Sequence, residues 1–449
     1  MLKNYFKIAW RNITRHKGFT LINVLGLSLG ICASLVIYLI TSYELSYDRF
    51  HPDGDRIYRI VANQRGDDGK MGYIGGMSNP LPMALRRELT GFERVTEFHN
   101  YFARVTVPNG SHEPKIFDPA KRGEEASPII IAEPQYFDIF NYQWLEGSPA
   151  AALSEPYKVV LSRSEVYKYF GPGQLGRVIG RQVVYKDVFA NDSLQLTVAG
   201  VVEDWAGHSD FGFKDFISFA TIEHSWLKEM IHMDNWGNWN PSAQGFVKLA
   251  KGVEAAQVEK QFPAAVAAHV PSYPGWHTSL VLQPLKDIHF NSDYRDTYSR
   301  HAHLPTLYAL MGIALFILLI AAVNFVNLST AQSLQRAKEI GVRKVLGGSK
   351  VSLRVQFLVE TFLVTAAAAV LAVVLAGPAL HFSRQFIPAG VALNLSDPAT
   401  VGFLLLIVIM TALLAGFYPA KVLSAYSPVL NLRGSGTQGA DKSGFFGGC

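Results

Sequence analysis

The sequence predicts an α+β integral membrane protein: four transmembrane helices, with a large mixed α/β extracytoplasmic domain inserted between the first two. The 449 residues are 49% hydrophobic but only 17% charged, whereas soluble domains carry about 25% charged residues. Four long stretches contain no Asp, Glu, Lys or Arg. The region between the first and second of these stretches, residues 44–306, is polar and long enough to fold as one large domain or two smaller ones.

A membrane-spanning helix is expected where about 20 mostly apolar residues follow one another, because the bilayer core holds no water for unpaired backbone groups. The predicted spans are residues 19–41, 307–328, 356–376 and 401–417. Four such stretches in one chain argue against the alternative of buried helices in a soluble protein. The first span could instead be a signal peptide, but its apolar stretch is too long and no A-x-A site follows it.

The charges flanking the spans predict the orientation of the chain. Residues 1–19 carry a net charge of +5, residues 331–356 also carry +5, and residues 44–306 carry −6. Basic flanks of membrane helices stay in the cytoplasm. We therefore expect both termini and the loop between the second and third spans, residues 329–355, inside, with residues 44–306 and a short loop at 377–400 outside.

The segments at the two ends of the chain have distinct compositions. Residues 1–18 place apolar side chains and Trp10 on one helical face and basic side chains elsewhere, which is typical of a helix lying on an anionic inner leaflet. A simple orientation signal is the alternative. Residues 418–449 become rich in Gly after position 433, which is typical of a cytoplasmic tail or linker.

Residues 44–306 alternate strand-like runs, such as YRIVANQ, YKVVLS and TSLVLQPL, with helical stretches such as 80–89 and 253–269. This alternation predicts a mixed α/β domain.

Motifs that would carry catalysis are missing from the sequence. No G-x-x-x-x-G-K-[ST] occurs, so ATP hydrolysis is expected in a partner subunit and not in this chain. A G-x-G-x-x-G begins at Gly171, but a strand-like run follows it, which indicates a turn. His301 and His303 lack further ligands for a metal. We predict no catalytic residue, no cofactor and no metal site.

Two features inside the spans predict packing. Gly26, Gly30 and Ser34 are spaced four residues apart on the first span, and small residues at this spacing allow helices to approach closely. Glu360 lies near the cytoplasmic edge of the third span, where it could reach the interface or pair with a base such as Arg354. A proton path is the alternative for Glu360.

The strongest motif is NFVNLSTAQSLQRAKEIGVRKVLGG, residues 324–348, in which an apolar span runs into a basic amphipathic helix. Glu339 precedes Arg343 by one helical turn, the favourable order for a charge pair. Gly341 costs about 1 kcal/mol relative to Ala inside a helix, so a Gly here suggests that something packs closely against the backbone. The simpler alternative is a solvated positive-inside loop.

This motif resembles the signature of the MacB/FtsX-type ABC transporter permeases. The resemblance covers about residues 1–434, because other stretches are also similar to that family in the expected order: YFKIAWRNITRHKGFTLINVLGLSLGI, AGVVEDWAGHSDFGFKDFISF, QFLVETF and YPAKVLSAYSPVLNLRG. It implies a permease subunit in a bacterial inner membrane. An ABC-type ATPase would dock on the cytoplasmic face, and its cycle would move a MacB-like outer domain to drive export, efflux or mechanotransmission.

Carried onto this chain, the resemblance makes the segment between the second and third spans the surface that couples to the ATPase. Its residues would be Arg336, Lys338, Glu339, Ile340, Gly341, Val342, Arg343 and Lys344.

The resemblance also implies further partners. Many related permeases continue into a second set of four helices, so we expect a homodimer or assembly with a second permease half, in contact with membrane lipids and with periplasmic or outer-membrane proteins. No nucleic acid is expected.

Two rival hypotheses remain. A membrane-anchored sensor or scaffold would bind a ligand through residues 44–306 without any ATPase, and a basic helix in the cytoplasmic loop argues against it. A membrane-tethered hydrolase would need a nucleophile or metal cluster that the sequence does not offer.

Overall fold

The computed structural model describes residues 2–15, 17–118, 128–335 and 349–425. The chain divides into two compact units. We call Met1–Leu45 with Pro305–Cys449 the membrane unit, and Ser46–Leu304 the sheet unit. Each is described by itself below.

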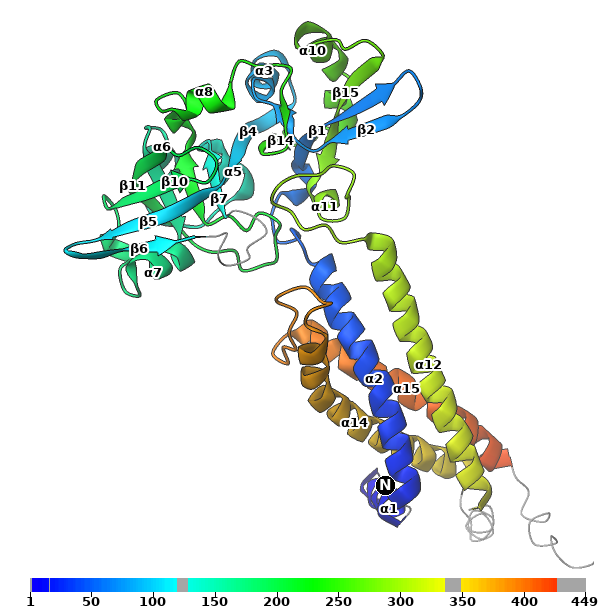
Figure 1. The fold of residues 1–449 in the computed structure, drawn as a ribbon. Helices are drawn as coiled ribbons and strands as arrows, with labels where there is room; N and C mark the ends of the chain where they lie inside the picture. The colour runs from blue at the N-terminus through cyan, green and yellow to red at the C-terminus, as the bar shows by residue number, and fades with distance from the viewer. Residues whose placement is uncertain (1, 16, 119–127, 336–348, 426–449) are drawn as a thin grey trace, which may run out of the picture. The chain divides into compact units, whose positions relative to one another are not determined.

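The described residues of the membrane unit form helices, apart from a loop at residues 384–397 that joins the last two of them (Figure 1). A short first helix is followed by four long ones: α1 (Leu2–Arg15), α2 (Lys17–Leu45), α12 (Leu304–Gln335), α14 (Lys350–Ser383) and α15 (Pro398–Ala425). Among the described residues, the last four are long and apolar enough to cross a membrane. The predicted fold class is therefore confirmed: four apolar candidate spans, with a mixed α/β domain between the first and the second.

Small side chains let the long helices of the membrane unit pack closely. Along α14, alanines at every fourth position are buried, including Ala368, Ala372 and Ala376, and they contact a core that includes Leu27 and Leu35 of α2. This spacing places them on one helical face. Within the membrane the hydrophobic effect does not drive helices together, so close van der Waals packing across small-residue faces favours their association.

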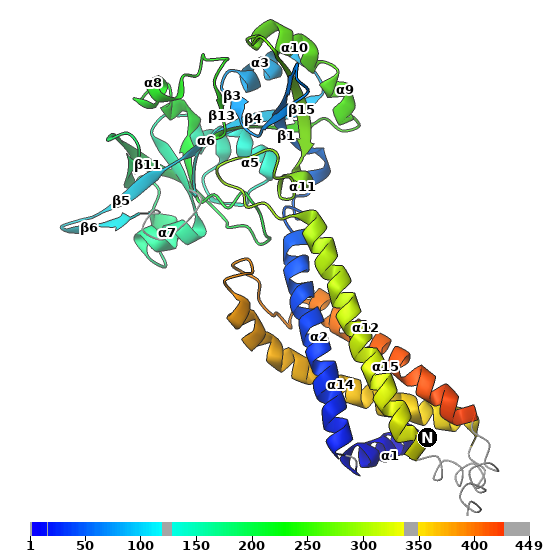
Figure 2. The ribbon, with the colours of Figure 1, turned by 45° about the vertical axis from the view of Figure 1, so that its right-hand side comes forward.

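The sheet unit is built on a large, mostly antiparallel sheet that contains 13 strands among the described residues (Figure 2). Its strand order is β15-β1-β14-β4-β7-β12-β9-β11-β10-β5-β6, with β2 beside β1 and β8 beside β11, and β7–β12 and β9–β11 are parallel pairs. The strands are β1 (Ile57–Gly66), β2 (Met71–Ile74), β4 (Phe92–Tyr101), β5 (Ala103–Asn109), β6 (His112–Phe117), β7 (Ile129–Ala132), β8 (Trp144–Glu146), β9 (Lys158–Ser162), β10 (Gln182–Asp187), β11 (Ser193–Val202), β12 (Asp215–Ser218), β14 (Ala243–Leu249) and β15 (Trp276–Pro284). A separate pair joins β3 (Met77–Ser78) to β13 (Trp239–Asn240).

Short helices pack against this sheet. They are α3 (Leu81–Glu88), α5 (Gln135–Phe140), α6 (Pro149–Leu153), α7 (Arg163–Phe170), α8 (Leu227–Ile231), α9 (Ala255–Glu259), α10 (Phe262–His269) and α11 (Leu285–Ile288). One core cluster is dominated by aromatic side chains, among them Phe98, Phe140, Phe211 and Phe246. Rings of this size bury large apolar areas and anchor the unit.

The apolar runs seen in the sequence match the strands β1, β9 and β15, and the helical stretch at 80–89 matches α3. The stretch at 253–269 differs from its expectation, since it forms two helices, α9 and α10. Pro263 lies at the start of α10. A proline has no backbone N–H to donate and is best tolerated in the first turn of a helix.

Candidate functional site

The segment predicted to couple to an ATPase joins α12 to α14. Its eight residues, Arg336, Lys338, Glu339, Ile340, Gly341, Val342, Arg343 and Lys344, lie outside the described residues, so their role stays a prediction. The described chain resumes at Ser349, whose side chain accepts a hydrogen bond from the Ser352 N–H over 3.1 Å. This cap satisfies one of the free donors at the beginning of α14.

The three small residues of the predicted packing face, Gly26, Gly30 and Ser34 of α2, all face α12. A Cβ added at Gly30 would lie 2.7 Å from the Cβ of Ala321, closer than real Cβ atoms come to one another. A Cβ added at Gly26 would lie 3.5 Å from an amide nitrogen of Asn324. One turn further along, the Ser34 hydroxyl donates to the carbonyl of Ala314 over 3.0 Å. We propose that this face holds α2 against α12.

Glu360 lies on α14, at the edge of a small cavity in the membrane unit that both polar and apolar side chains line. Its carboxylate accepts a hydrogen bond from the side-chain amide of Asn12 in α1 over 3.1 Å. A second bond between the same helices joins Tyr5 to Ser352 over 2.9 Å. The cavity, of about 30 Å³, is also lined by Asn23 of α2. We propose that Glu360 fastens α1 to α14 through Asn12, which is a different structural role from the predicted pairing with a base such as Arg354 or reach to the interface.

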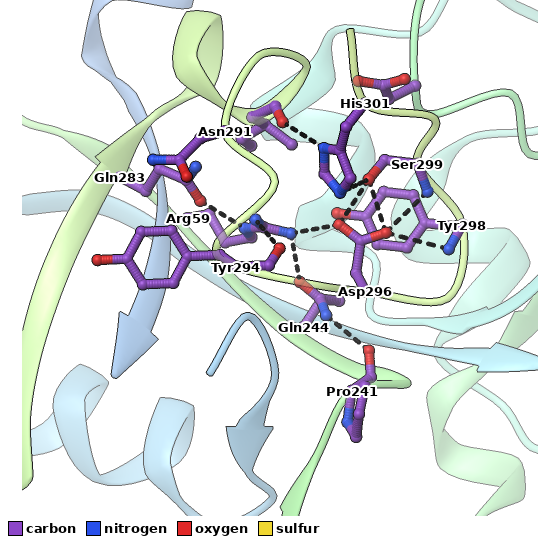
Figure 3. A network of polar contacts seen from close by, with 12 residues as sticks. Arg59, Pro241, Gln244, Gln283, Asn291, Tyr294, Asp296, Tyr298, Ser299 and His301 are labelled. Carbon is purple, nitrogen blue, oxygen red and sulfur yellow. Dashed lines mark hydrogen bonds and ion pairs between the residues drawn. The ribbon is translucent and has the colours of Figure 1, made fainter. Parts of the chain in front are cut away.

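A buried ion pair lies in the sheet unit (Figure 3). The guanidinium of Arg59 in β1 donates to the carboxylate of Asp296 over 2.6 Å, and neither side chain exposes any surface. Arg59 also donates to Gln283 of β15 over 2.9 Å, to the Tyr294 carbonyl over 3.1 Å, and to Gln244 of β14 over 3.4 Å. One side chain thus joins three neighbouring strands to the segment that precedes α12.

Asp296 is held ionised by its partners. Burial alone would raise its pKa, but the charge of Arg59 and hydrogen bonds from the Ser299 hydroxyl and N–H outweigh burial and lower it. A buried carboxylate with a cation and several donors around it remains charged, which is the condition for a stable internal ion pair.

A second buried polar cluster lies nearby in the sheet unit. The ring of His289 stacks on Tyr47, with ring centroids 3.7 Å apart, and its Nδ1 lies 3.0 Å from the carboxylate of Asp210. The Ser209 hydroxyl and the Asp210 N–H both donate to the carboxylate of Asp48. Burial and the neighbouring carboxylates raise the pKa of Asp210, while His289 opposes that shift.

Both clusters consist of hydrogen bonds and ion pairs between side chains of the sheet unit. Among the described residues, no group of three or more His, Cys, Asp or Glu side chains is placed to hold a metal ion. His301 contacts the Ile288 carbonyl over 3.0 Å and Ser299 over 3.3 Å. Gly171 and Gly173 both have positive φ and are followed by a 3-10 turn and then β10, as expected of a turn.

Sequence reasoning did not single out Arg59 or Asp296. The available signal was a charged residue inside the apolar run of β1, whose neighbours Ile60 and Val61 are fully buried. A charge in a buried strand demands a partner, but the sequence does not say which of the many acidic residues supplies it.

Fold and sites together define a multi-pass membrane protein with a mixed α/β domain inserted between its first two spans. Two family descriptions match: residues 20–265 match the MacB-like periplasmic core domain, and residues 311–428 match the FtsX-like permease C-terminal region. The chain belongs to the MacB/FtsX-type family of ABC transporter permeases.

Two curated relatives carry ATP-binding and permease parts in one chain. "Probable syringafactin export ATP-binding/permease protein SyfD" of Pseudomonas syringae pv. tomato is 23% identical over 81% of this chain and 49% of its own length. "Macrolide export ATP-binding/permease protein MacB" of Haemophilus ducreyi is 22% identical over 94% of this chain and 55% of its own length. The chain therefore spans about half the length of these relatives. A solved structure, the periplasmic region of MacB from Actinobacillus actinomycetemcomitans, is 15% identical over 51% of this chain and 91% of its own, with a TM-score of 0.33.

Proposed function

We propose that this chain is the permease subunit of an ABC exporter, and that it transmits ATP hydrolysis by a partner ATPase to movement of the sheet unit. The observation that carries the proposal is that both matched regions occur in one chain in the family's order: the MacB-like core region first and the FtsX-like region after it. The curated relatives are named as exporters, which supports export as the direction of transport.

The proposed docking surface for the ATPase is the basic segment between α12 and α14. It carries Arg336, Lys338, Arg343 and Lys344 against a single acid, Glu339. A positively charged segment next to the membrane suits a protein partner with a complementary acidic groove. Gly341, on the same segment, would permit close approach of that partner to the backbone.

The proposed orientation places both termini and this segment in the cytoplasm, and the sheet unit on the outer side of a bacterial inner membrane. It rests on the excess of Lys and Arg in the first 19 residues and in residues 331–356. The proposed assembly pairs this chain with a second copy or with another permease half, because an ABC-type ATPase acts as a dimer and needs two docking surfaces.

Affinity purification of the tagged chain from native membranes in a mild detergent tests the proposal. An ATPase subunit should co-purify with the native chain, and Gly341→Trp or Arg343→Glu should remove it. A charge reversal on an exposed site of the sheet unit, Lys251→Glu, is the matched control and should retain the subunit. Failure of a correctly inserted chain to bring down any ATPase would favour the sensor or scaffold hypothesis.

A further inference from the structure

The sheet unit is joined to the membrane helices by two chain segments. The outgoing segment, residues 46–51, directly follows α2, and the returning segment, residues 289–303, directly precedes α12. Both belong to the sheet unit. These two segments are therefore the covalent connections through which α2 and α12 continue into the sheet unit.

The two segments contact each other. The Tyr47 ring of the outgoing segment contacts two side chains of the returning segment: His289 stacks on it, and the Arg300 guanidinium lies 5.8 Å from its centroid. The backbone N–H of Asp48 donates to the carbonyl of His208 over 2.9 Å, and Asp210, two residues further on, pairs with His289. The turn around residue 209 thus binds both segments.

The returning segment is also fastened to the sheet, through Arg59. The guanidinium reaches across from β1 to the Asp296 carboxylate and the Tyr294 carbonyl of the returning segment. In the other direction it bonds Gln283 and Gln244 on the two strands that flank β1. Figure 3 shows these groups converging on the single guanidinium.

Stability alone is a poor explanation for such a pair. Burying two charges costs free energy that well-packed apolar side chains of similar volume would not require. Apolar side chains pack without directional bonds. A guanidinium, with five donors in a fixed plane, instead holds its acceptors in one geometry.

We propose that Arg59 and Asp296 are positioning residues of the sheet unit that fix the returning segment to β1, so that displacement of α12 relative to α2 moves the sheet at β1 and its neighbours. This deepens the proposed function, since it names the residues by which the sheet unit receives movement from the membrane helices. The proposal predicts that movement of the sheet in response to movement of α12 relative to α2 depends on the ion pair and not on the stability of the fold.

The test joins α2 to α12 by a chemical cross-link and measures hydrogen exchange in the sheet. In a full-length chain with Cys32→Ser and Cys449→Ser, Ser34→Cys and Ala314→Cys place two thiols where a side chain and a carbonyl already make contact. The chain is reconstituted in nanodiscs, with the thiols either joined by a short bis-maleimide or left free. Hydrogen exchange is then measured in β1, β15 and the returning segment.

In the chain that keeps Arg59 and Asp296, joining the two helices is expected to slow hydrogen exchange in β1, β15 and the returning segment. The double variant Arg59→Met with Asp296→Leu leaves no unpaired charge, so it should fold with a similar melting temperature and lose this response. The matched control replaces the more exposed pair of Arg86 and Glu133 by Arg86→Met with Glu133→Leu, and should keep it.

The proposal is overturned if the double variant responds to the cross-link as the native pair does, or if the cross-link leaves exchange in these segments unchanged with Arg59 and Asp296 present. No ATPase takes part in the experiment. Absence of a co-purifying ATPase would contradict the proposed function and leave this result standing, so the two failures are distinguishable.

Discussion

The guanidinium of Arg59 and the carboxylate of Asp296 lie 2.6 Å apart with both side chains fully buried, although 237 residues separate them in the chain. The first residue belongs to a strand that begins soon after α2 ends, and the second lies shortly before α12 begins. The pair therefore links the beginning of the sheet unit's chain to its end, close in sequence to the points where the chain leaves α2 and enters α12.

Removing one partner of the pair should destabilise the sheet unit more than removing both. Arg59→Met leaves the Asp296 carboxylate buried without its cation, which costs about 3–5 kcal/mol, whereas Arg59→Met with Asp296→Leu leaves no charge and should be close to neutral. Chemical unfolding of the full chain in detergent, followed by the fluorescence of the tryptophans in the sheet unit, measures both. Equal losses for the single and the double variant would contradict this expectation.

Much of the fold could be predicted because its elements follow local patterns. The four spans are long apolar runs, and β9 and β15 are short apolar runs between turn residues. β4 was not foreseen, because it buries Thr96, Glu97 and His99 among its apolar side chains, so that neither alternation nor a continuous apolar run marks it. Buried polar residues of this kind depend on partners brought by the tertiary fold.

The candidate sites also divide into those that follow from local spacing and those that depend on the tertiary fold. Gly26, Gly30 and Ser34 could be proposed as a packing face because a four-residue spacing alone places them on one side of a helix. The partner of Arg59 could not be proposed, since it depends on a returning segment that reaches β1 only after the whole sheet has formed.

Enlarging Gly30 should disturb the contact between α2 and α12. An added Cβ would lie 2.7 Å from the Cβ of Ala321, so Gly30→Leu forces the helices apart, at a cost of about 1–3 kcal/mol for overpacking. Gly312→Ala on α12 is the matched control, because nothing lies within 4 Å of the added Cβ. Unfolding in detergent–SDS mixtures compares them, and a Gly30→Leu variant as stable as the Gly312→Ala variant would show that the contact tolerates a larger side chain.

Replacing Glu360 separates its two candidate roles. Glu360→Gln keeps a carbonyl oxygen that can accept the Asn12 amide, whereas Glu360→Leu leaves that donor unpaired, so only Glu360→Leu should lose about 1–2 kcal/mol of stability. The measurement is unfolding in detergent together with the ATP hydrolysis rate of the co-purified ATPase. A Glu360→Gln chain that is as stable as the native one but whose co-purified ATPase is inactive would favour the proton path instead.

The stability of the sheet unit should fall as the pH rises toward 8, because of Asp215. Burial, followed by the nearby Glu165 carboxylate, raises the pKa of Asp215 from 3.8 to about 8, although hydroxyls of Tyr169 and Tyr185 donate to it over 2.8 and 2.7 Å and oppose the shift. Since the folded state binds this proton more tightly than the unfolded state, the stabilisation is complete below a pH of about 4 and is lost as the pH rises to about 8. Thermal unfolding of the full chain between pH 6 and about 8.5 should show a falling melting temperature that Asp215→Asn flattens. Asp53→Asn is the control: the pKa of Asp53 is lowered to about 2 by Lys248 and Arg56, so its removal should leave the slope unchanged, and a slope that Asp215→Asn does not alter would exclude Asp215 as its source.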